Sequence, residues 1–313
     1  MPQTRSQNPA DYIVPLNING LEGRMLHMPA PKNKRSDIEV MFVYGAHSSL
    51  ERWWGLMQVL NRYGAVTMPD LPGFGGMDSF YKIGKKPTID NLADYLAAFV
   101  KLRYKRKKVV IAGMSFGFVV ATRMLQRYPE LTKRVTLMVS IVGFADSNDF
   151  SFKPVRYWTY LTGTRILSWR PPAFVFRHIA LHPWVLRNFY SRTHNAKNKF
   201  KDITDPAEIE HLNQVEIGLW HDNDVRTWAY TVNEFMRFHN TGVKVDLPVW
   251  HVGTTDDHFF DNGVVEQHMR IIFKDFHMVK INMKAHAPSV IADEKAAAAY
   301  IPAALKRKMA TIA

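Results

Sequence analysis

Ser115 stands between two glycines in the segment GMSFG, where an apolar run ends and a helical pattern begins. Residues 107–114 predict a buried strand, and residues 116–131 predict a helix. A strand, a G-x-S-x-G turn and a helix in this order are typical of a strained turn that presents the serine hydroxyl above a sheet edge. The glycines prevent a clash where the strand and the helix pass closely. The segment therefore predicts Ser115 as a nucleophile, and the alternative is an inert serine in a tight connection.

A serine hydroxyl becomes a good nucleophile when a base takes its proton and an acid orients that base. His286 comes just after the strand-like run FHMVKINM, and Asp256 comes three residues after the run LPVWHVG. The order serine, aspartate, histidine along the chain is the one expected for a serine on such a turn. We therefore expect Ser115, His286 and Asp256 to form a catalytic triad. Asp257 is the main alternative to Asp256, and Asp146 is a weaker one.

The oxyanion of an acyl-transfer reaction needs two N–H donors. One is expected from the backbone of Phe116, directly after the serine, and the other from Ala46, after the strand-like run VMFVYG. The N-terminus of the helix that begins at Phe116 also favours negative charge. The alternative for the segment YGAHSS is an ordinary turn at the end of a strand. His47, Met114 and Trp158 are expected to contact the substrate.

Strand-like and helix-like segments alternate along most of the chain, which predicts a mostly parallel sheet flanked by helices. One predicted helix has apolar residues at helical spacing, which indicates a single buried face. These residues are Leu92, Tyr95, Leu96, Phe99 and Leu102.

The loop PDLPGFGG lacks the Lys-Ser/Thr pair of a phosphate-binding P-loop, so Asp70 is interpreted as a turn residue rather than a ligand.

Residues 147–240 interrupt this alternation because they lack clear strands. We interpret them as a helical cap, or lid, inserted into a core that is formed by residues 1–146 and 241–313. Residues 151–200 hold nine Lys/Arg, no Asp/Glu and eleven aromatic residues.

Three interpretations of this basic, aromatic lid stay open. Its aromatic side chains can pack on the core while the arginines are solvated, or its apolar face can admit a hydrophobic acyl chain or aromatic substrate. In the third, the lid makes weak contact with an anionic membrane surface, which Arg and Trp together suit. Residues 201–240 carry eight Asp/Glu against three Lys/Arg, and no recognised nucleic-acid motif is present, so no nucleic-acid partner is expected.

The composition bounds the remaining possibilities. The 313 residues are 47% hydrophobic and 22% charged, with a net charge of +13, and none is cysteine. Disulfides, thiolate metal sites and cysteine nucleophiles are therefore excluded. The first twenty residues lack the apolar segment of a signal peptide, and no uninterrupted apolar run reaches about 18 residues, so a cytoplasmic location is expected. The proposed chemistry needs no metal and no organic cofactor.

With these motifs in this order, the chain resembles the α/β-hydrolase superfamily, and within it the capped serine hydrolases. The resemblance rests on YGAHSSLERWW, MPDLPGFGGMDSF, GMSFG, GTTDD and AHAP, each after a predicted strand. It implies an eight-stranded, mostly parallel sheet flanked by helices, a Ser-His-Asp triad and a helical cap after the sixth strand. Tyr44 stands where many relatives have His before Gly, and Ala285 stands where many have Gly before the histidine.

The resemblance implies a serine hydrolase that cleaves the carboxylic ester of a fairly hydrophobic small molecule through an acyl-enzyme. The alternative among enzymes is a hydrolase of C–C bonds in ring-cleavage diketones, which uses the same triad. Thioesterase, lactonase and perhydrolase activities are also compatible with it. The alternative of another class is a non-catalytic or membrane-surface binding protein on the same fold.

Overall fold

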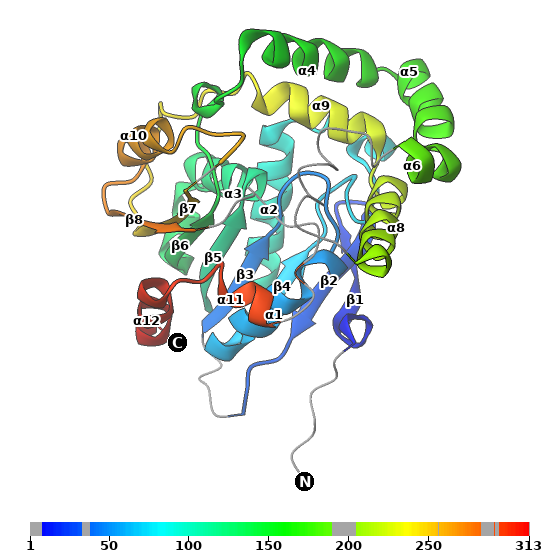
Figure 1. The fold of residues 1–313 in the computed structure, drawn as a ribbon. Coiled ribbons are helices and arrows are strands. Elements are labelled where there is room, and N and C mark those ends of the chain that lie inside the picture. The colour runs from blue at the N-terminus through cyan, green and yellow to red at the C-terminus, as the bar shows by residue number, and fades with distance from the viewer. Residues whose placement is uncertain are drawn as a thin grey trace.

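The computed structural model describes residues 8–32, 38–189, 205–255, 257–282, 291 and 294–312. Its centre is one eight-stranded sheet in the order β1-β2-β4-β3-β5-β6-β7-β8 (Figure 1). The strands are β1 (Ile13–Ile18), β2 (Leu21–Met28), β3 (Ile38–Val43), β4 (Ala65–Pro69), β5 (Lys108–Met114), β6 (Val135–Ile141), β7 (Val249–Thr254) and β8 (Phe276–Ile281). The predicted eight-stranded sheet is confirmed.

The direction of the strands determines which residues meet at one edge. β2 pairs antiparallel with both β1 and β4, and all other neighbours in the sheet pair parallel. The central strands read as continuous apolar runs because helices cover both of their faces. The carboxyl ends of the parallel strands share one edge of the sheet, and Ser115 follows β5 at that edge.

Helices cover both faces of the sheet. Figure 1 shows α1 and α11 in front of it and α2 and α3 behind it. The helices of the core are α1 (Trp54–Leu60), α2 (Ile89–Arg103), α3 (Phe116–Arg127), α10 (Asn262–Ile272), α11 (Glu294–Ala298) and α12 (Ala303–Ile312). Short 3₁₀ turns lie at Pro9–Tyr12, Glu51–Trp53, Asn61–Tyr63, Phe80–Ile83, Pro129–Arg134 and Ser147–Asp149.

The buried face predicted for α2 is correct except at its end. Leu92, Tyr95, Leu96 and Phe99 are buried as predicted. Leu102, the fifth residue of the predicted face, is 58% exposed. The last turn of the helix packs through Val100 and Tyr104 instead, and the ring of Tyr104 lies 6.3 Å from that of Phe99. The spacing of apolar residues identifies a helix face, but which turn of that face is covered depends on the neighbouring elements.

A helical insertion separates β6 from β7. Its described elements are α4 (Pro154–Leu167), α5 (Arg170–Val175), a π-helical turn (Phe176–Ala180), α6 (Pro183–Phe189), α8 (Pro206–Asp222) and α9 (Val225–Phe235). Figure 1 shows α9 over the core and α4 outside α9. The division of the chain at residues 147 and 240 into a core and a cap stays a prediction. In the described ranges, no helix has the length and apolar character that a membrane span requires.

Candidate active site

Ser115 joins β5 to α3 through a strained turn. Its φ is +48° and its ψ is −121°. L-residues rarely adopt this backbone region, which costs on the order of 1–3 kcal/mol. The Ser115 N–H donates to the carbonyl of Ile141 over 2.9 Å and fastens the turn to β6. Within residues 109–122, Ser115 is the one residue that is not buried, so the turn leaves it accessible at the sheet edge.

The two glycines around Ser115 are required by close packing. A Cβ on Gly117 would lie 2.2 Å from the carbonyl oxygen of Val43 and 2.4 Å from that of Tyr44. A Cβ on Gly113 would lie 2.6 Å from the Cα of Phe118. Real Cβ atoms do not approach other heavy atoms so closely. The turn therefore brings α3 against both β5 and the end of β3 at a distance that only glycine permits.

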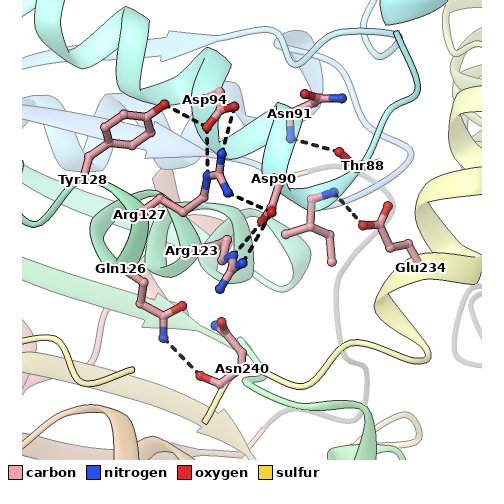
Figure 2. Close-up of polar contacts among 11 residues, drawn as sticks. Thr88, Asp90, Asn91, Asp94, Arg123, Gln126, Arg127, Tyr128, Glu234 and Asn240 are labelled. Carbon is pink, nitrogen blue, oxygen red and sulfur yellow. Dashed lines mark hydrogen bonds and ion pairs between the residues drawn. The ribbon is translucent and has the colours of Figure 1, made fainter. Parts of the chain in front are cut away.

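A network of charged side chains holds α3 on α2 (Figure 2). Arg123 donates from Nε to Asp90 over 2.6 Å. Arg127 donates to Asp90 over 2.8 Å and to Asp94 over 2.9 Å, and Tyr128 Oη donates to Asp94 over 2.9 Å. Each pair is partly exposed and contributes little by itself. As a set, the pairs fix the position of α3 along α2. Because Ser115 directly precedes α3, they also help to position the strained turn.

Two hydrogen bonds extend this network to the insertion (Figure 2). Glu234 of α9 accepts the N–H of Ile89, at the N-terminus of α2, over 3.1 Å. Gln126 of α3 donates to the carbonyl of Asn240 over 3.0 Å. Burial raises the pKa of Glu234 to about 7; the Ile89 N–H opposes this rise and the Asp90 carboxylate adds to it. The insertion is thus anchored on the two helices that support the turn.

Two backbone donors lie in the segments that adjoin Ser115. A Cβ on Gly45 would lie 3.4 Å from the Cβ of Ser115 and 3.9 Å from the nitrogen of Phe116, so the loop after β3 passes directly over the turn. Within the described part of the chain, the N–H groups of Ala46 and Phe116 have no acceptor. Phe116 also begins α3, where the helix dipole favours negative charge. The site therefore offers N–H groups to an anion.

A buried carboxylate holds the loop after β3. Tyr44 Oη donates to Oδ1 of Asp70 over 2.8 Å and accepts the N–H of Leu71 over 2.8 Å. Asp70 is fully buried and also accepts Nε of Arg24 over 3.3 Å. Burial raises the pKa of Asp70 well above its usual value, and the Arg24 cation opposes this rise. The interpretation of Asp70 as a turn residue missed this supporting role; the available signal was a carboxylate directly after a buried strand.

His47 meets two tryptophans of the insertion. It adopts a φ of +57°, and its ring centroid lies 4.0 Å from that of Trp220 on α8 and 6.5 Å from that of Trp228 on α9. The two indole rings lie 5.0 Å apart in an edge-to-face arrangement. Sequence analysis did not single out either tryptophan, because helical spacing does not reveal which loop a helix will meet. The loop that carries Ala46 is therefore bordered by aromatic side chains.

A second aromatic contact joins the insertion to the turn. The ring of Phe116 lies 5.3 Å from that of Phe235 on α9, and Phe235 lies 5.6 Å from Phe144. Phe144 stacks on Phe260 at 4.6 Å. Sequence analysis named Phe116 for its backbone N–H but did not identify Phe144, Phe235 or Phe260. Together these phenylalanines form a mostly buried aromatic cluster that starts at the residue after Ser115.

The residues predicted to contact substrate occupy three different environments. Met114 is buried in β5 directly before Ser115, and His47 lies in the loop that passes over the turn. Trp158 is 62% exposed on α4, with its ring against Tyr157. The structure therefore brings His47 and Met114 to the segments around Ser115 but presents the Trp158 indole to solvent.

The predicted base and acid, His286 and Asp256, lie outside the described residues, so their roles stay predictions. The alternative acid Asp257 lies within them. Its Oδ1 accepts the N–H of Phe259 over 2.8 Å and that of Phe260 over 3.2 Å. Asp257 therefore stabilises the turn that follows β7.

The weaker alternative, Asp146, also has a structural role. It accepts the N–H of Asn148 over 3.0 Å as the cap of a short 3₁₀ turn, and its carboxylate lies 3.1 Å from Nδ1 of His239.

In the ranges that the structure describes, no three His, Asp or Glu side chains are grouped to hold a metal ion.

Comparison with known proteins places this fold in a large family. The model of the alpha/beta hydrolase fold family matches residues 40–286. Among curated proteins, Protein ABHD8 from Homo sapiens and from Bos taurus are each 31% identical over 108 residues. That stretch is 34% of this chain and 24% of each relative, so the match spans about a quarter of their length.

Solved structures share the whole fold at low sequence identity. A thermophilic esterase from Thermogutta terrifontis has a TM-score of 0.63 at 17% identity, covering 95% of this chain and 98% of that one. A membrane phospholipase A has a TM-score of 0.64 at 16% identity, covering 95% and 86%. A deformylase from Pseudomonas putida S16 has a TM-score of 0.60 at 14% identity, covering 88% and 94%. The chain belongs to the alpha/beta hydrolase fold family.

Proposed function

We propose that the protein is a serine hydrolase that cleaves the carboxylic ester of a fairly hydrophobic small molecule. The observation that carries the proposal is the turn at Ser115. It is strained, it is the accessible point of a buried segment, and it adjoins N–H groups that have no acceptor among the described residues. A folded protein keeps such strain where the surrounding structure holds it, and such positions cluster at active sites.

In the proposed reaction, Ser115 Oγ attacks the ester carbonyl carbon while His286 takes its proton. The N–H groups of Phe116 and Ala46 bind the resulting oxyanion. Collapse of this intermediate breaks the bond to the alcohol, which leaves with the proton that His286 returns. Water then attacks the acyl-enzyme with His286 as the base and releases the carboxylic acid. Asp256 keeps the histidine in the required tautomer.

The preference for a hydrophobic substrate is supported by the aromatic side chains around the turn. Phe116 of α3 contacts Phe235 of α9. His47, in the loop after β3, contacts Trp220 of α8, which in turn contacts Trp228 of α9. Ligand sites of this kind are lined mostly by apolar and aromatic groups, with a few polar groups at the reacting centre. Esterase and phospholipase structures among those with the same fold are consistent with ester chemistry.

The test is hydrolysis of p-nitrophenyl acetate, butyrate and longer-chain esters by the wild type, by Ser115→Ala and by Ser151→Ala. Ser151 is an exposed serine before α4 and serves as the matched control. We expect Ser115→Ala to lower kcat/KM by at least about 10³-fold and the control to leave it unchanged. We also expect a fluorophosphonate probe to label the wild type and the control but not Ser115→Ala.

Equal turnover by Ser115→Ala and the wild type would contradict the assignment of the nucleophile. Absence of both turnover and labelling in the folded wild type would instead favour a non-catalytic binding protein. Labelling without ester turnover would exclude a simple esterase and direct the substrate search to C–C bonds of ring-cleavage diketones.

A further inference from the structure

Exposed apolar side chains are concentrated on the first part of the insertion. Of the twelve large hydrophobic residues that are exposed in the described part of the chain, eight lie between residues 155 and 184. These eight, which we call the outer apolar face, are Val155, Trp158, Ile166, Trp169, Phe174, Val175, Ile179 and Trp184. The other four are scattered over the core and the chain that leads to β7. Single exposed hydrophobic residues are common on proteins, whereas a contiguous set indicates an interaction surface.

Helix α4 presents large apolar side chains on its exposed side. Its inner side makes hydrogen bonds: Tyr157 Oη donates to the carbonyl of Met236 over 2.8 Å, and Asn233 donates to the carbonyl of Leu161 over 2.7 Å. Its outer side carries Val155, 80% exposed, together with Trp158 and Ile166. A surface helix of a globular protein normally turns its apolar stripe inward and its polar stripe to water. The exposed Val155, Trp158 and Ile166 of α4 depart from this pattern and indicate an apolar phase on its outer side.

The same side continues through the next elements. Trp169, at the start of α5, and Phe174 and Ile179 further along are all exposed. The inner side is fastened by Arg177, which donates to the carbonyls of Asn223 and His221 over 3.2 and 2.8 Å. Figure 1 shows α4 and α5 as the outermost layer of the insertion. The outer apolar face therefore lies on helices that are anchored to the rest of the insertion.

The segment that carries the outer apolar face has charge of one sign. Residues 151–186 contain five Lys/Arg and no Asp/Glu. Arg156 and Arg177 are engaged, since Arg156 lies 4.2 Å over the ring of Phe152 and Arg177 donates inward. Lys153, Arg165 and Arg170 are exposed, and none of them takes part in an ion pair within the described residues. An anionic partner surface would complement them.

We propose that the outer apolar face docks on the surface of an anionic lipid bilayer. Its tryptophan, phenylalanine and aliphatic side chains enter the boundary between head groups and acyl chains, and Lys153, Arg165 and Arg170 bind lipid phosphates. Tryptophan with arginine suits this boundary because each has an apolar body and a polar end. Adsorption of this kind needs no membrane-spanning helix.

Two other occupants fit the surface less well. A second copy of the chain would place two cationic surfaces against each other without acidic groups to pair them. A single-stranded nucleic acid would stack its bases on aromatic rings, but Val155, Ile166, Val175 and Ile179 offer no ring for stacking. A bilayer uses all of these side chains and the positive charge together.

The test is sedimentation of the full chain with sucrose-loaded vesicles. One set is phosphatidylcholine alone and the other contains about 30% phosphatidylglycerol, which supplies a negative surface potential. The apolar variant is Trp158→Ser/Ile166→Ser/Trp169→Ser, and the charge variant is Arg165→Gln/Arg170→Gln. The matched control is Leu102→Ser/Ile271→Ser, which removes exposed hydrophobic side chains elsewhere. Circular dichroism confirms that each variant is folded.

We expect the wild type and the matched control to bind the anionic vesicles equally, and more tightly than the neutral ones. The affinity of both surface variants for the anionic vesicles should be lower than that of the wild type by at least about tenfold. Raising the salt concentration should weaken wild-type binding because it screens the lipid charge. The Ser115→Ala variant should bind like the wild type, which separates this proposal from the catalytic one.

The proposal is overturned if the wild type does not bind anionic vesicles, or if the apolar variant binds them as well as the wild type does. Analytical ultracentrifugation covers the second-copy alternative. A wild-type dimer that the apolar variant converts to a monomer, without vesicle binding, would assign the outer apolar face to self-association and overturn the lipid assignment.

Discussion

Tyr44 donates its phenolic O–H to Asp70 across 2.8 Å in a fully buried site, and Tyr44 directly precedes the loop that adjoins Ser115. The two residues are 26 positions apart, and each directly follows a strand, Tyr44 after β3 and Asp70 after β4. Removal of the hydroxyl in Tyr44→Phe leaves the Asp70 carboxylate and the Leu71 N–H without that partner. Buried polar groups left in this way cost about 1–3 kcal/mol of stability.

We therefore expect Tyr44→Phe to lower the free energy of unfolding by about that amount in urea titrations. Because the same contact holds the Gly45–Ala46 loop, we also expect kcat toward the best ester to fall by about tenfold. Tyr63→Phe is the control, since the Tyr63 hydroxyl has no hydrogen bond among the described residues. Equal stability and activity of Tyr44→Phe and Tyr63→Phe would contradict this account.

Gly117→Ala should destabilise the protein because its Cβ would lie 2.2 Å from the Val43 carbonyl. Overpacking of this kind typically costs about 1–3 kcal/mol, and here the obstacle is backbone. Gly218→Ala is the matched control, because nothing lies within 4 Å of a Cβ at that position in α8. The control should be unchanged or stabilised by up to about 1 kcal/mol. The measurement is thermal unfolding, and an unchanged midpoint for Gly117→Ala would exclude the close approach.

Asp256→Asn and Asp257→Asn should separate the two candidate acids. We expect Asp256→Asn to lower kcat by about 10⁴-fold, as loss of the orienting carboxylate does in a Ser-His-Asp triad. Asp257→Asn retains an oxygen that accepts the Phe259 N–H, so it should keep most of the activity. The opposite pattern would assign the acid to Asp257, and full activity of both variants would exclude both.

His251 should make the protein less stable in acid. It is fully buried against Ser140 Oγ, 2.8 Å from its Nδ1, and desolvation lowers its pKa from 6.5 to about 4. The unfolded chain therefore takes up a proton near pH 6.5 while the fold resists it, so stability falls as the pH falls from 6.5 to 4. The loss approaches about 3 kcal/mol.

Urea unfolding between pH 4 and 7 measures this effect of His251. His251→Asn should remove most of this pH dependence, whatever its effect on stability at pH 7. His258→Gln, at an exposed histidine, should leave the dependence as it is in the wild type. An equal slope in wild type and His251→Asn would contradict the assignment.

Glu234 should act in the opposite direction. Burial raises its pKa from 4.5 to about 7, so the fold favours the protonated form. The stability associated with this group is complete below pH 4.5 and is lost as the pH rises through 7. Glu234→Gln keeps an oxygen for the Ile89 N–H but carries no charge. We expect its Tm to exceed that of the wild type at pH 8 and not at pH 4.5, and equal Tm values at pH 8 would contradict this.

The turn at Ser115 could be predicted from a short stretch because the strand, the serine and the helix that form it are contiguous in the chain. An apolar strand, a serine between two glycines and a helix occupy residues 108–127, and the clash that Gly113 avoids, with Phe118, arises within that unit. The clash that Gly117 avoids is with the end of β3 and could not be read from this stretch. The alternation of strands and helices is also visible along the chain, and by itself it indicates a mostly parallel sheet. The predicted fold was right for this reason.

The surroundings of that turn come from residues far apart in the chain. Asp70 accepts a hydrogen bond from Tyr44, and His47 lies against Trp220, more than 170 positions away. No local pattern pairs such residues, because packing against a neighbouring element selects the partner.

The amino-acid sequence alone therefore determined where the functional segments occur along the chain: the candidate nucleophile, the N–H donors and the basic lid. Tertiary structure alone decided which side chains of those segments face inward. Trp158 points outward from α4 and Leu102 from α2, although both sit at apolar positions of a helix. Helical periodicity defines a face, but burial of that face depends on what the rest of the chain places against it.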